Sequence, residues 1–490
     1  IADGGKPSAL GASIEYAQNW IWDGGKWNYT GSTASTNRCA TLYKETALGV
    51  DNSAAILNLN GAFTGAGNFV ADGNGIVRPG SAKFFSYTGN TIVKSGTLQL
   101  EYIKNMTAKS RVYLGEEGNT SPKLVMAGGN FVTKSSNDQY LNYEFPIEVL
   151  ENTYSTFTVQ RNCSLKCKVT GSGTLEYKIP YVREYVSGDW SGFYGTLVAN
   201  GVNSDKDGSQ LMLYNSGIPN ASINLKGNAR VTHWNPNVTV KLGGLSGDKG
   251  TYLGGTTKKT TGQTVTWQVG NANTNETFNG VIDRRCSASG YNCNVNIVKE
   301  GSGYWRLTGS NTYNGTTIVT GGRLIIDGSN QGTGLMTIKE NGSLSGKGTI
   351  AGDVVVSGSV QADLSASGSC QPLTIKGKLT ANNATLVINM EDVTGTIADD
   401  TEIKVFNLAS AIQGTGFTDI QPATPSATQL WDTSLLATKG IIKVVSNVAN
   451  GISTPSADNS YSSAIYDLTG KKTSSPKGLY IKDGKKHIAR

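Results

Sequence analysis

The chain has 490 residues with 62 Gly but only 12 Pro, and its hydrophobic and charged fractions, 37% and 16%, are both low. This length allows two or three domains or one elongated array, and a chain rich in Gly, Ser, Thr and Asn favours turns and exposed β faces over helices. The net charge is +7, but the chain contains no dense run of basic residues. No stretch approaches the ~20 apolar residues that span a bilayer. No CxxC…CxxC or HExxH pattern occurs. We therefore predict no nucleic-acid partner, no membrane span, no metal and no other cofactor.

Residues 1–40 are predicted to cover the N-terminal end of the fold. They contain the stretch "WIWDGGKW", with Trp20, Trp22 and Trp27 close together. The terminal units of a repetitive fold need covering, and bulky aromatic side chains serve that purpose. We interpret the three tryptophans as a cap over an open first coil.

A thirteen-residue pattern occurs twice, more than two hundred residues apart. The stretch "SYTGNTIVKSGTL" (86–98) matches "TYNGTTIVTGGRL" (312–324) at seven of thirteen positions without a gap. Residues 171–201 form a looser third copy that shares an aromatic-x-Gly-Thr turn. The aromatic residues at the head of the three copies, Tyr87, Phe193 and Tyr313, are predicted to stack or form corners rather than to bind a ligand.

Each unit alternates apolar and polar residues over short spans, with Gly or Asn between them, as residues 334–364 show. Alternation with a period of two predicts strands, and Gly supplies positive φ at the corners. One such unit cannot bury its own apolar face, whereas stacked copies can. Residues 41–446 are therefore predicted to form an all-β fold, a parallel β-helix. The alternative is an array of β-sandwiches, which needs many hairpin turns.

Surface contacts are predicted at two turn-rich loops, 200–208 and 283–293. The second loop opens with Asp283, Arg284 and Arg285. Aromatic side chains that we expect to be exposed could stack on sugar rings, foremost Trp190 and Trp234; the others are Trp20, Trp22, Trp27 and Trp305.

Catalytic residues are not predicted anywhere in the chain. A β-helix lyase needs clustered carboxylates for Ca²⁺ and a basic residue on one face, but no carboxylate pair recurs at coil spacing. The acidic pairs at 391–392 and 399–400 are interpreted as solvated turns. His233, beside Trp234, is expected in a surface turn.

The segments after residue 240 resemble a known family. The blocks "LGGLSG" (242–247), "WQVGNANTNETFNGVI" (267–282), "IVKEGSGYWRLTGSNTYNGTTIVTGGRLIIDG" (297–328) and "ENGSLSGKGTIAGDVVV" (340–356) are similar, in this order, to the passenger-associated transport repeat of bacterial autotransporter surface proteins. The opening tryptophans and the stretch "LWDTSLLATKGIIKVV" (430–445) resemble the two ends of such passengers. The resemblance implies a secreted, right-handed parallel β-helix.

An extracellular location would favour disulfides. Cys286 and Cys293 flank a turn-rich loop, so a local disulfide is the preferred pairing. An extended chain would place Cys163 and Cys167 roughly 13 Å apart, beyond the ~7 Å limit, so either the chain turns between them or each pairs elsewhere, with Cys39 as a candidate. Buried free thiols are the alternative for every cysteine.

The C-terminal residues resemble a different module. Residues 447–460 read as a linker, and residues 461–490, with "IYDLTGKK" and "KGLYIKDGKK", look like the C-terminal sorting module of secreted Bacteroidota proteins. This resemblance implies type IX secretion or a related route, and a small β-sandwich-like module.

Together these features predict an extracellular or cell-surface protein of a Bacteroidota-type bacterium. We expect a structural or adhesive rod rather than an enzyme. Its expected partners are a glycan, a host or neighbouring cell surface, or copies of itself. The alternatives are a polysaccharide lyase or hydrolase, a non-catalytic glycan-binding protein, and a filament subunit stacked through open ends.

Overall fold

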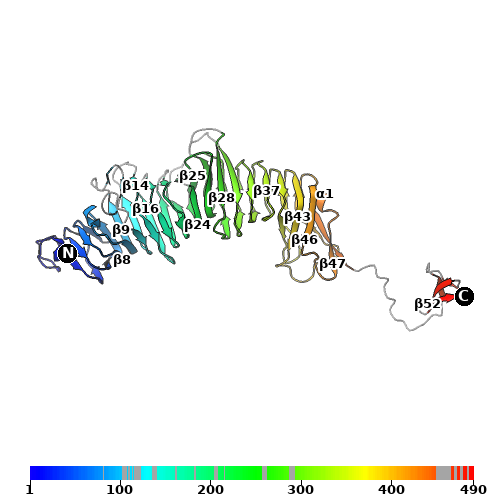
Figure 1. The fold of residues 1–490 in the computed structure, drawn as a ribbon, viewed down its shortest axis with the longest axis horizontal. Coiled ribbons are helices and arrows are strands. Elements are labelled where there is room, and N and C mark those ends of the chain that lie inside the picture. The colour runs from blue at the N-terminus through cyan, green and yellow to red at the C-terminus, as the bar shows by residue number, and fades with distance from the viewer. Residues whose placement is uncertain are drawn as a thin grey trace.

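Along each strand, side chains point alternately into and out of the coil, and the inward apolar residues fill its interior. In β31 (Asn294–Lys299), Val295 and Ile297 point inward and are fully buried, while the residues between them lie on the outside. The computed structural model describes the chain except residues 81, 102–106, 109–110, 113, 115–122, 135–140, 160–162, 181–183, 204–207, 215, 257–261, 286–292, 448–464, 468–471, 475–477, 483–484 and 490. The described chain is nearly all β, and its strands stack in parallel along a rod (Figure 1). The predicted parallel β-helix is therefore confirmed, and the alternative of a sandwich array is wrong.

Three faces of strands enclose the core, and their pairings are parallel except that between β10 and β11 on the third face. Strands of the first face are β2 (Lys26–Tyr29), β5 (Thr46–Val50), β12 (Leu124–Met126), β15 (Ile147–Val149), β18 (Val169–Gly171), β21 (Gly192–Phe193), β28 (Thr264–Val269), β31, β34 (Thr317–Val319), β37 (Met336–Ile338) and β40 (Val354–Val356). Strands of the second face are β3 (Ala34–Thr36), β6 (Ile56–Leu59), β13 (Asn130–Lys134), β16 (Tyr154–Val159), β19 (Thr174–Ile179), β22 (Thr196–Gly201), β29 (Glu276–Phe278), β32 (Tyr304–Leu307), β35 (Gly322–Ile326), β38 (Gly342–Ser345) and β41 (Ser359–Asp363).

Six long strands bend at the corner and belong to both of these faces. They are β8 (Phe69–Pro79), β9 (Thr91–Glu101), β24 (Gly217–Gly227), β26 (Val238–Gly247), β43 (Leu379–Asn389) and β46 (Gln413–Gln421). The bend shifts the register inside β8, where one end pairs with β5 and the other with β6. A local shift of this kind turns a strand without ending its ladder.

The third face is made of shorter strands. They are β1 (Ile21–Trp22), β4 (Ala40–Leu42), β7 (Phe63–Gly65), β10 (Thr107–Ala108), β11 (Arg111–Val112), β14 (Leu141–Tyr143), β17 (Cys163–Leu165), β20 (Glu184–Val186), β23 (Ser209–Leu213), β25 (Ala229–His233), β27 (Tyr252–Thr256), β30 (Val281–Ile282), β33 (Ser310–Asn311), β36 (Ser329–Asn330), β39 (Thr349–Ile350), β42 (Leu373–Ile375) and β45 (Phe406–Leu408).

The remaining elements lie outside the three parallel faces. The 3-10 helices η1 (Ala17–Asn19) and η2 (Ala82–Phe85) lie in the N-terminal coils. A small antiparallel sheet of β44 (Glu402–Lys404), β48 (Ile441–Ser446) and β47 (Gln429–Asp432), with α1 (Leu436–Lys439), follows the last coils. The described part of the C-terminal module forms a single antiparallel sheet, with β50 (Lys472–Thr473), β49 (Ile465–Asp467), β51 (Gly478–Lys482) and β52 (Lys485–Ala489) in spatial order, and not two layers.

Stacked coils place like residues in columns through the core. On the second face one column contains aliphatic and then aromatic side chains, in the order Leu57, Val77, Leu98, Phe131, Phe157, Tyr177, Ala199 and Leu225. The rings of Phe131 and Phe157 have centroids 5.0 Å apart. Each column continues only because the next coil covers it, which is how a stack of units buries what one unit cannot.

One inward position of the first face carries a lysine. Lys299 lies in register between Val269 and Val319 and is 1% exposed. Its Nζ donates hydrogen bonds to the carbonyl oxygens of Glu300 at 2.6 Å, Gly321 at 3.3 Å and Gly301 at 3.4 Å. Burial lowers the pKa of Lys299 to about 8, against the charge of Glu300, which raises it.

The two matching segments adopt the same structure in different coils. The hydroxyl of Tyr87 lies 2.6 Å from that of Thr91, and the hydroxyl of Tyr313 lies 2.7 Å from that of Thr317. Both tyrosines are buried, which confirms that they are corner residues of the interior. The looser third copy is different, because Thr196 there begins β22 on the second face, whereas Thr91 and Thr317 begin first-face strands.

The tryptophans show that the predicted exposure is largely wrong. Trp20, Trp22, Trp190 and Trp305 are 8%, 0%, 1% and 1% exposed. Trp20 and Trp22 pack edge to face with centroids 5.0 Å apart, and the indole of Trp305 donates a hydrogen bond to the Leu245 carbonyl inside the coil. Indole rings bury more apolar area than most side chains, so they fill a wide interior well.

Candidate functional site

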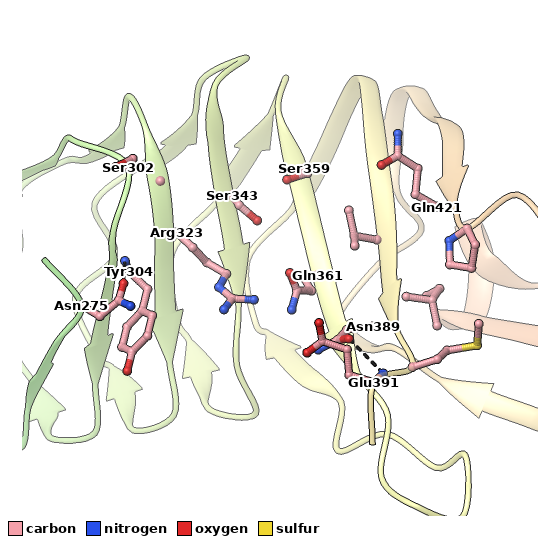
Figure 2. Close-up of a pocket in the computed structure, with 15 residues that line it drawn as sticks. Asn275, Ser302, Tyr304, Arg323, Ser343, Ser359, Gln361, Asn389, Glu391 and Gln421 are labelled. Carbon is pink, nitrogen blue, oxygen red and sulfur yellow. Dashed lines mark hydrogen bonds between the residues drawn. The ribbon is translucent and has the colours of Figure 1, made fainter. Parts of the chain in front are cut away.

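A broad groove runs along the second face of the described chain, with a volume of about 910 Å³. It crosses β32, β35, β38, β41 and β43, so that each coil contributes outward-facing side chains (Figure 2). The residues that line it are Asn275, Ser302, Tyr304, Gly322, Arg323, Ser343, Ser359, Gln361, Val387, Ile388, Asn389, Met390, Glu391, Gln421 and Pro422.

Strand register decides which side chains are neighbours in this groove. Tyr304 pairs with Arg323, Arg323 with Ser343, and Ser343 with Ser359. Neighbouring strands lie about 4.8 Å apart, so a phenol ring, a guanidinium and two hydroxyls follow one another along the rod axis. Gln361 lies on the Ser359 strand and faces the same way, two residues further along.

Hydrogen bonds hold the far end of the groove. The side-chain amides of Gln361 and Asn389 both donate to Asp363 Oδ1, at 2.6 Å and 3.0 Å. The backbone N–H of Glu391 donates to Asn389 Oδ1 at 3.2 Å, as Figure 2 shows. These contacts fix the two amides in place, while the Glu391 carboxylate lies exposed at the rim.

The near end of the groove is held by Asn275 and Arg306. Asn275 Oδ1 accepts a hydrogen bond from the backbone N–H of Tyr304 at 3.0 Å. Arg306 lies two residues after Tyr304 with its guanidinium 5.9 Å from the ring centroid, and it forms an ion pair with Asp327. These contacts therefore hold the backbone and the ring of Tyr304 in place at the near end of the groove.

A smaller hollow of about 460 Å³ lies at a corner of earlier coils. Its lining is polar, and Asn271 Nδ2 donates to Asn220 Oδ1 across it at 3.0 Å. The lining residues are Ser172, Tyr194, Gly195, Thr196, Asn220, Ser222, Asn271, Ala272 and Thr274.

The described start of the predicted loop site 283–293 is held by ion pairs. Asp283 is 3% exposed, and its carboxylate accepts hydrogen bonds from Arg230 at 3.0 Å and from Arg285 at 2.7 Å. Both guanidinium groups also lie over the ring of Tyr252, at 4.2 Å and 5.1 Å from its centroid. The prediction of Asp283 as a surface contact is therefore wrong, because ion pairs bury it. Arg284 and Arg285 are exposed, and residues 286–292, with Cys286, lie outside the described residues.

Of the two tryptophans predicted as surface contacts, Trp190 is buried and Trp234 is half-buried. Trp190, predicted as a surface contact, lies in the core and packs edge to face on Phe193, with centroids 5.7 Å apart. Trp234 is half-buried on the third face, where its ring stacks on Tyr214 at 5.2 Å. His233 beside it is buried rather than in a surface turn, because it points inward at the end of β25. Within the loop 200–208, residues 204–207 lie outside the described part of the chain.

Four of the described cysteines are free thiols, namely Cys39, Cys163, Cys167 and Cys370. Cys163 Sγ lies 3.1 Å from the Tyr177 hydroxyl, and burial raises the pKa of the Cys167 thiol to about 12. The expected disulfide membership of Cys39, Cys163 and Cys167 is therefore not found, because the latter two occupy inward sites of the coil. Cys293 is buried, and its predicted partner Cys286 lies outside the described residues, so this pairing stays a prediction.

Carboxylates are sparse on the described surface of the groove. The acidic pairs at 391–392 and 399–400 lie exposed in turns, as predicted. Among the described residues, no group of three or more His, Cys, Asp and Glu could hold a metal ion. In the same part of the chain, no helix is both long and apolar enough to cross a membrane.

Sequence reasoning missed the groove residues. A usable signal existed, since Arg323, Ser343 and Ser359 each directly precede a buried aliphatic residue of the same column, Leu324, Leu344 and Val360. Once the register between coils is known, these polar–aliphatic pairs place their polar members on one outer line.

The passenger-associated-transport-repeat family matches residues 84–100 and 297–326. These ranges contain the whole of both matching segments and two strands of the groove, β32 and β35. The chain therefore carries repeats of an autotransporter-type passenger.

Two curated proteins are similar to parts of the chain. The adhesin BmaC autotransporter of Brucella suis biovar 1 is 38% identical over 96 residues, which is 19% of this chain and 3% of that protein. The uncharacterized protein YuaQ of Escherichia coli is 36% identical over 109 residues, 21% of this chain and 7% of that protein. The chain thus spans only a small part of the relatives it matches. The repeats, the β-helix and the adhesin relative fit an autotransporter-like passenger at a cell surface.

Proposed function

We propose that this chain is the adhesive rod of a secreted or surface-attached bacterial protein, and that it binds glycans of a host or neighbouring cell along the groove on its second face. The observation that carries the proposal is the line of Tyr304, Arg323, Ser343 and Ser359 across successive coils. An extended ligand meets the same kind of polar surface from coil to coil. The stacked coils display this line without rearrangement.

The chemistry of the lining supports glycan binding. Sugar rings present apolar faces that stack on aromatic rings and hydroxyls that need many hydrogen-bond partners. The groove supplies Tyr304 for stacking and Ser, Asn and Gln side chains for hydrogen bonding, while Val387 and Met390 add an apolar floor. Ligand sites typically combine such an apolar surface with a few fixed polar groups.

The same lining favours binding over cleavage. Glycoside hydrolysis commonly uses a pair of carboxyl groups flanking the scissile bond. Among the described residues of the groove, Glu391 supplies the one carboxyl group, and it lies exposed at the rim.

Beads coated with the full chain test this function on glycan-coated surfaces and on cultured cells. We expect retention of the beads by a subset of glycans. Tyr304→Ala should weaken this binding about tenfold, equivalent to about 1.4 kcal/mol, because the stacking surface is lost. Tyr43→Ala is the matched control, since Tyr43 is 62% exposed and lies outside the groove.

Two results would overturn the proposal. One is a failure of the coated beads to adhere to any glycan or cell. The other is adhesion that Tyr43→Ala weakens as much as Tyr304→Ala. Thermal unfolding of both variants verifies that neither substitution unfolds the rod.

A further inference from the structure

Arg323 lies at the centre of the groove with its charge unmatched. It occupies an outward position of β35, is half-buried, and is flanked in register by Tyr304 and Ser343. Figure 2 shows the side chain extended along the groove toward Gln361. No ion pair or side-chain hydrogen bond joins the guanidinium to any described residue; Arg323 is held through its backbone N–H, which donates to the Gly303 carbonyl.

Three other arginines of the neighbouring coils, Arg230, Arg285 and Arg306, are matched by carboxylates. Arg306, two residues after Tyr304, forms an ion pair with Asp327. Arg230 shares Asp283 with Arg285. The pairing of those arginines makes the open guanidinium of Arg323 a distinct feature of the groove.

Among the described residues, the carboxylates near Arg323 form no ion pair with it. Asp363 is engaged by the amides of Gln361 and Asn389. Glu391 is exposed next to Asn389, with its side chain turned toward Gln361 in Figure 2. A half-buried guanidinium without an anion favours a carboxylate from a ligand, because its planar fork donates two parallel hydrogen bonds to both oxygens.

We infer that the groove selects carboxylated saccharides, with the carboxylate bound by Arg323, the sugar ring against Tyr304, and neighbouring hydroxyls on Ser343, Ser359 and Gln361. This rests on the proposed glycan-binding function, because it names the class of glycan. The negative charge of Glu391 disfavours a second carboxylate beside Gln361. The ligand therefore lies with its acidic sugar toward Tyr304.

Isothermal titration of the full chain tests the inference with two matched pairs of probes. One pair is sialyllactose and lactose. The other is an oligosaccharide containing glucuronate and its carboxyl-reduced form, which keeps every other group. We expect at least one acidic member to bind about tenfold more tightly than its neutral partner. The pair that shows the preference identifies whether a sialate or a uronate is the better ligand.

Variants separate a specific site from general charge attraction. Arg323→Gln should reduce the acidic preference to less than about twofold. Lys339→Gln removes the same charge at an exposed turn position outside the groove, and it should keep the preference. Arg323→Lys, which keeps the charge but loses the fork, should give an intermediate value. Circular dichroism and thermal unfolding verify the fold of each variant.

Three outcomes overturn the inference. Equal affinity for acidic and neutral members would refute the selectivity, while adhesion that depends on Tyr304 would leave the proposed function intact. An equal loss in Lys339→Gln and Arg323→Gln would show long-range attraction and no site. Absence of binding to any saccharide would remove the proposed function and this inference together.

Discussion

Glu184 lies inside the coil on the third face, where a carboxylate is costly. Its Oε2 accepts hydrogen bonds from the backbone N–H of Cys163 at 3.0 Å and from the Tyr177 hydroxyl at 3.4 Å, while its Oε1 has no partner among the described residues. Burial raises the pKa of Glu184 from 4.5 to about 7, and the hydrogen bonds from Cys163 and Tyr177 offset only part of this effect. The folded protein therefore holds a proton that the unfolded chain releases.

This proton makes stability depend on pH in one window. Between pH 4.5 and pH 7 the folded state binds more protons at Glu184 than the unfolded state, so the free energy of unfolding falls as the pH rises. The loss amounts to about 3 kcal/mol at 1.36 kcal/mol per pKa unit. We expect Glu184→Gln to remove this fall, as measured by denaturant unfolding at pH 4.5, 6 and 8.

The exposed Glu151, in a turn after β15, supplies the control for this experiment. Glu151→Gln should keep the pH dependence of the wild type. An unchanged pH dependence in Glu184→Gln would show that the buried carboxyl does not hold the proton.

Each of the two matching segments turns from the first face to the second at a glycine. Gly96 and Gly322 have φ of 62° and 59°, in the left-handed region, at the turn between the first and second faces. A Cβ at either position would collide with a carbonyl oxygen of the preceding coil, that of Gly73 or Gly303. Glycine is required there for two reasons, its backbone conformation and the close approach of the neighbouring coil.

Substitution can separate these two reasons. Gly416 in β46 has φ of 82° but has open space around the position of a Cβ. Gly416→Ala should cost about 1 kcal/mol for the left-handed backbone alone. Gly322→Ala and Gly96→Ala should each cost about 3 kcal/mol, since overpacking adds to the strain.

Denaturant unfolding of the three variants measures these differences. Equal losses in all three would mean that coil-to-coil contact does not constrain the corner. A much larger loss at one repeat than at the other would argue against their structural equivalence.

At the scale of the whole molecule, one core cluster extends along the β-helix from Trp20 to Val444. It ends at β48, whose Ile442 and Val444 are buried by the sheet that follows the last coils. The described strands of the C-terminal module contribute no residue to this cluster. Among the described residues, the hydrophobic stabilisation of the rod, which grows with buried apolar area, comes from residues before 447.

Removal of residues 447–490 should therefore leave the rod intact. We expect the midpoint of thermal unfolding, followed by the β signal in circular dichroism, to change by less than about 2 °C, because 1 kcal/mol corresponds to only a few degrees in chains of this size. A larger fall would show that the module stabilises the β-helix. Its proposed role in sorting, and the Bacteroidota origin that this implies, stay predictions.

Local patterns in the amino-acid order were sufficient to specify the fold, the corners and the columns. Alternation of apolar residues, glycines at positive φ, and the Tyr–Thr pairs at 87/91 and 313/317 are local features, and each acts over a few neighbouring residues. Two stretches with the same local features fold alike, so the repeat is recognisable from the amino-acid order alone. The burial of individual aromatic residues could not be predicted in the same way. Trp190 and Trp234 both lie near turns, yet Trp190 fills the core and Trp234 stacks on a neighbouring ring at the surface.

The groove and the state of the charged residues depend instead on tertiary packing. Whether Tyr304, Arg323 and Ser343 share an outer line depends on the register between coils of unequal length, and that register is set by hydrogen bonds between strands far apart in sequence. Asp283 and Arg323 look equally solvated in the sequence, but packing joins the first to two arginines and leaves the second open. Ion pairs and grooves are properties of distances between coils, and no local pattern of residues contains those distances.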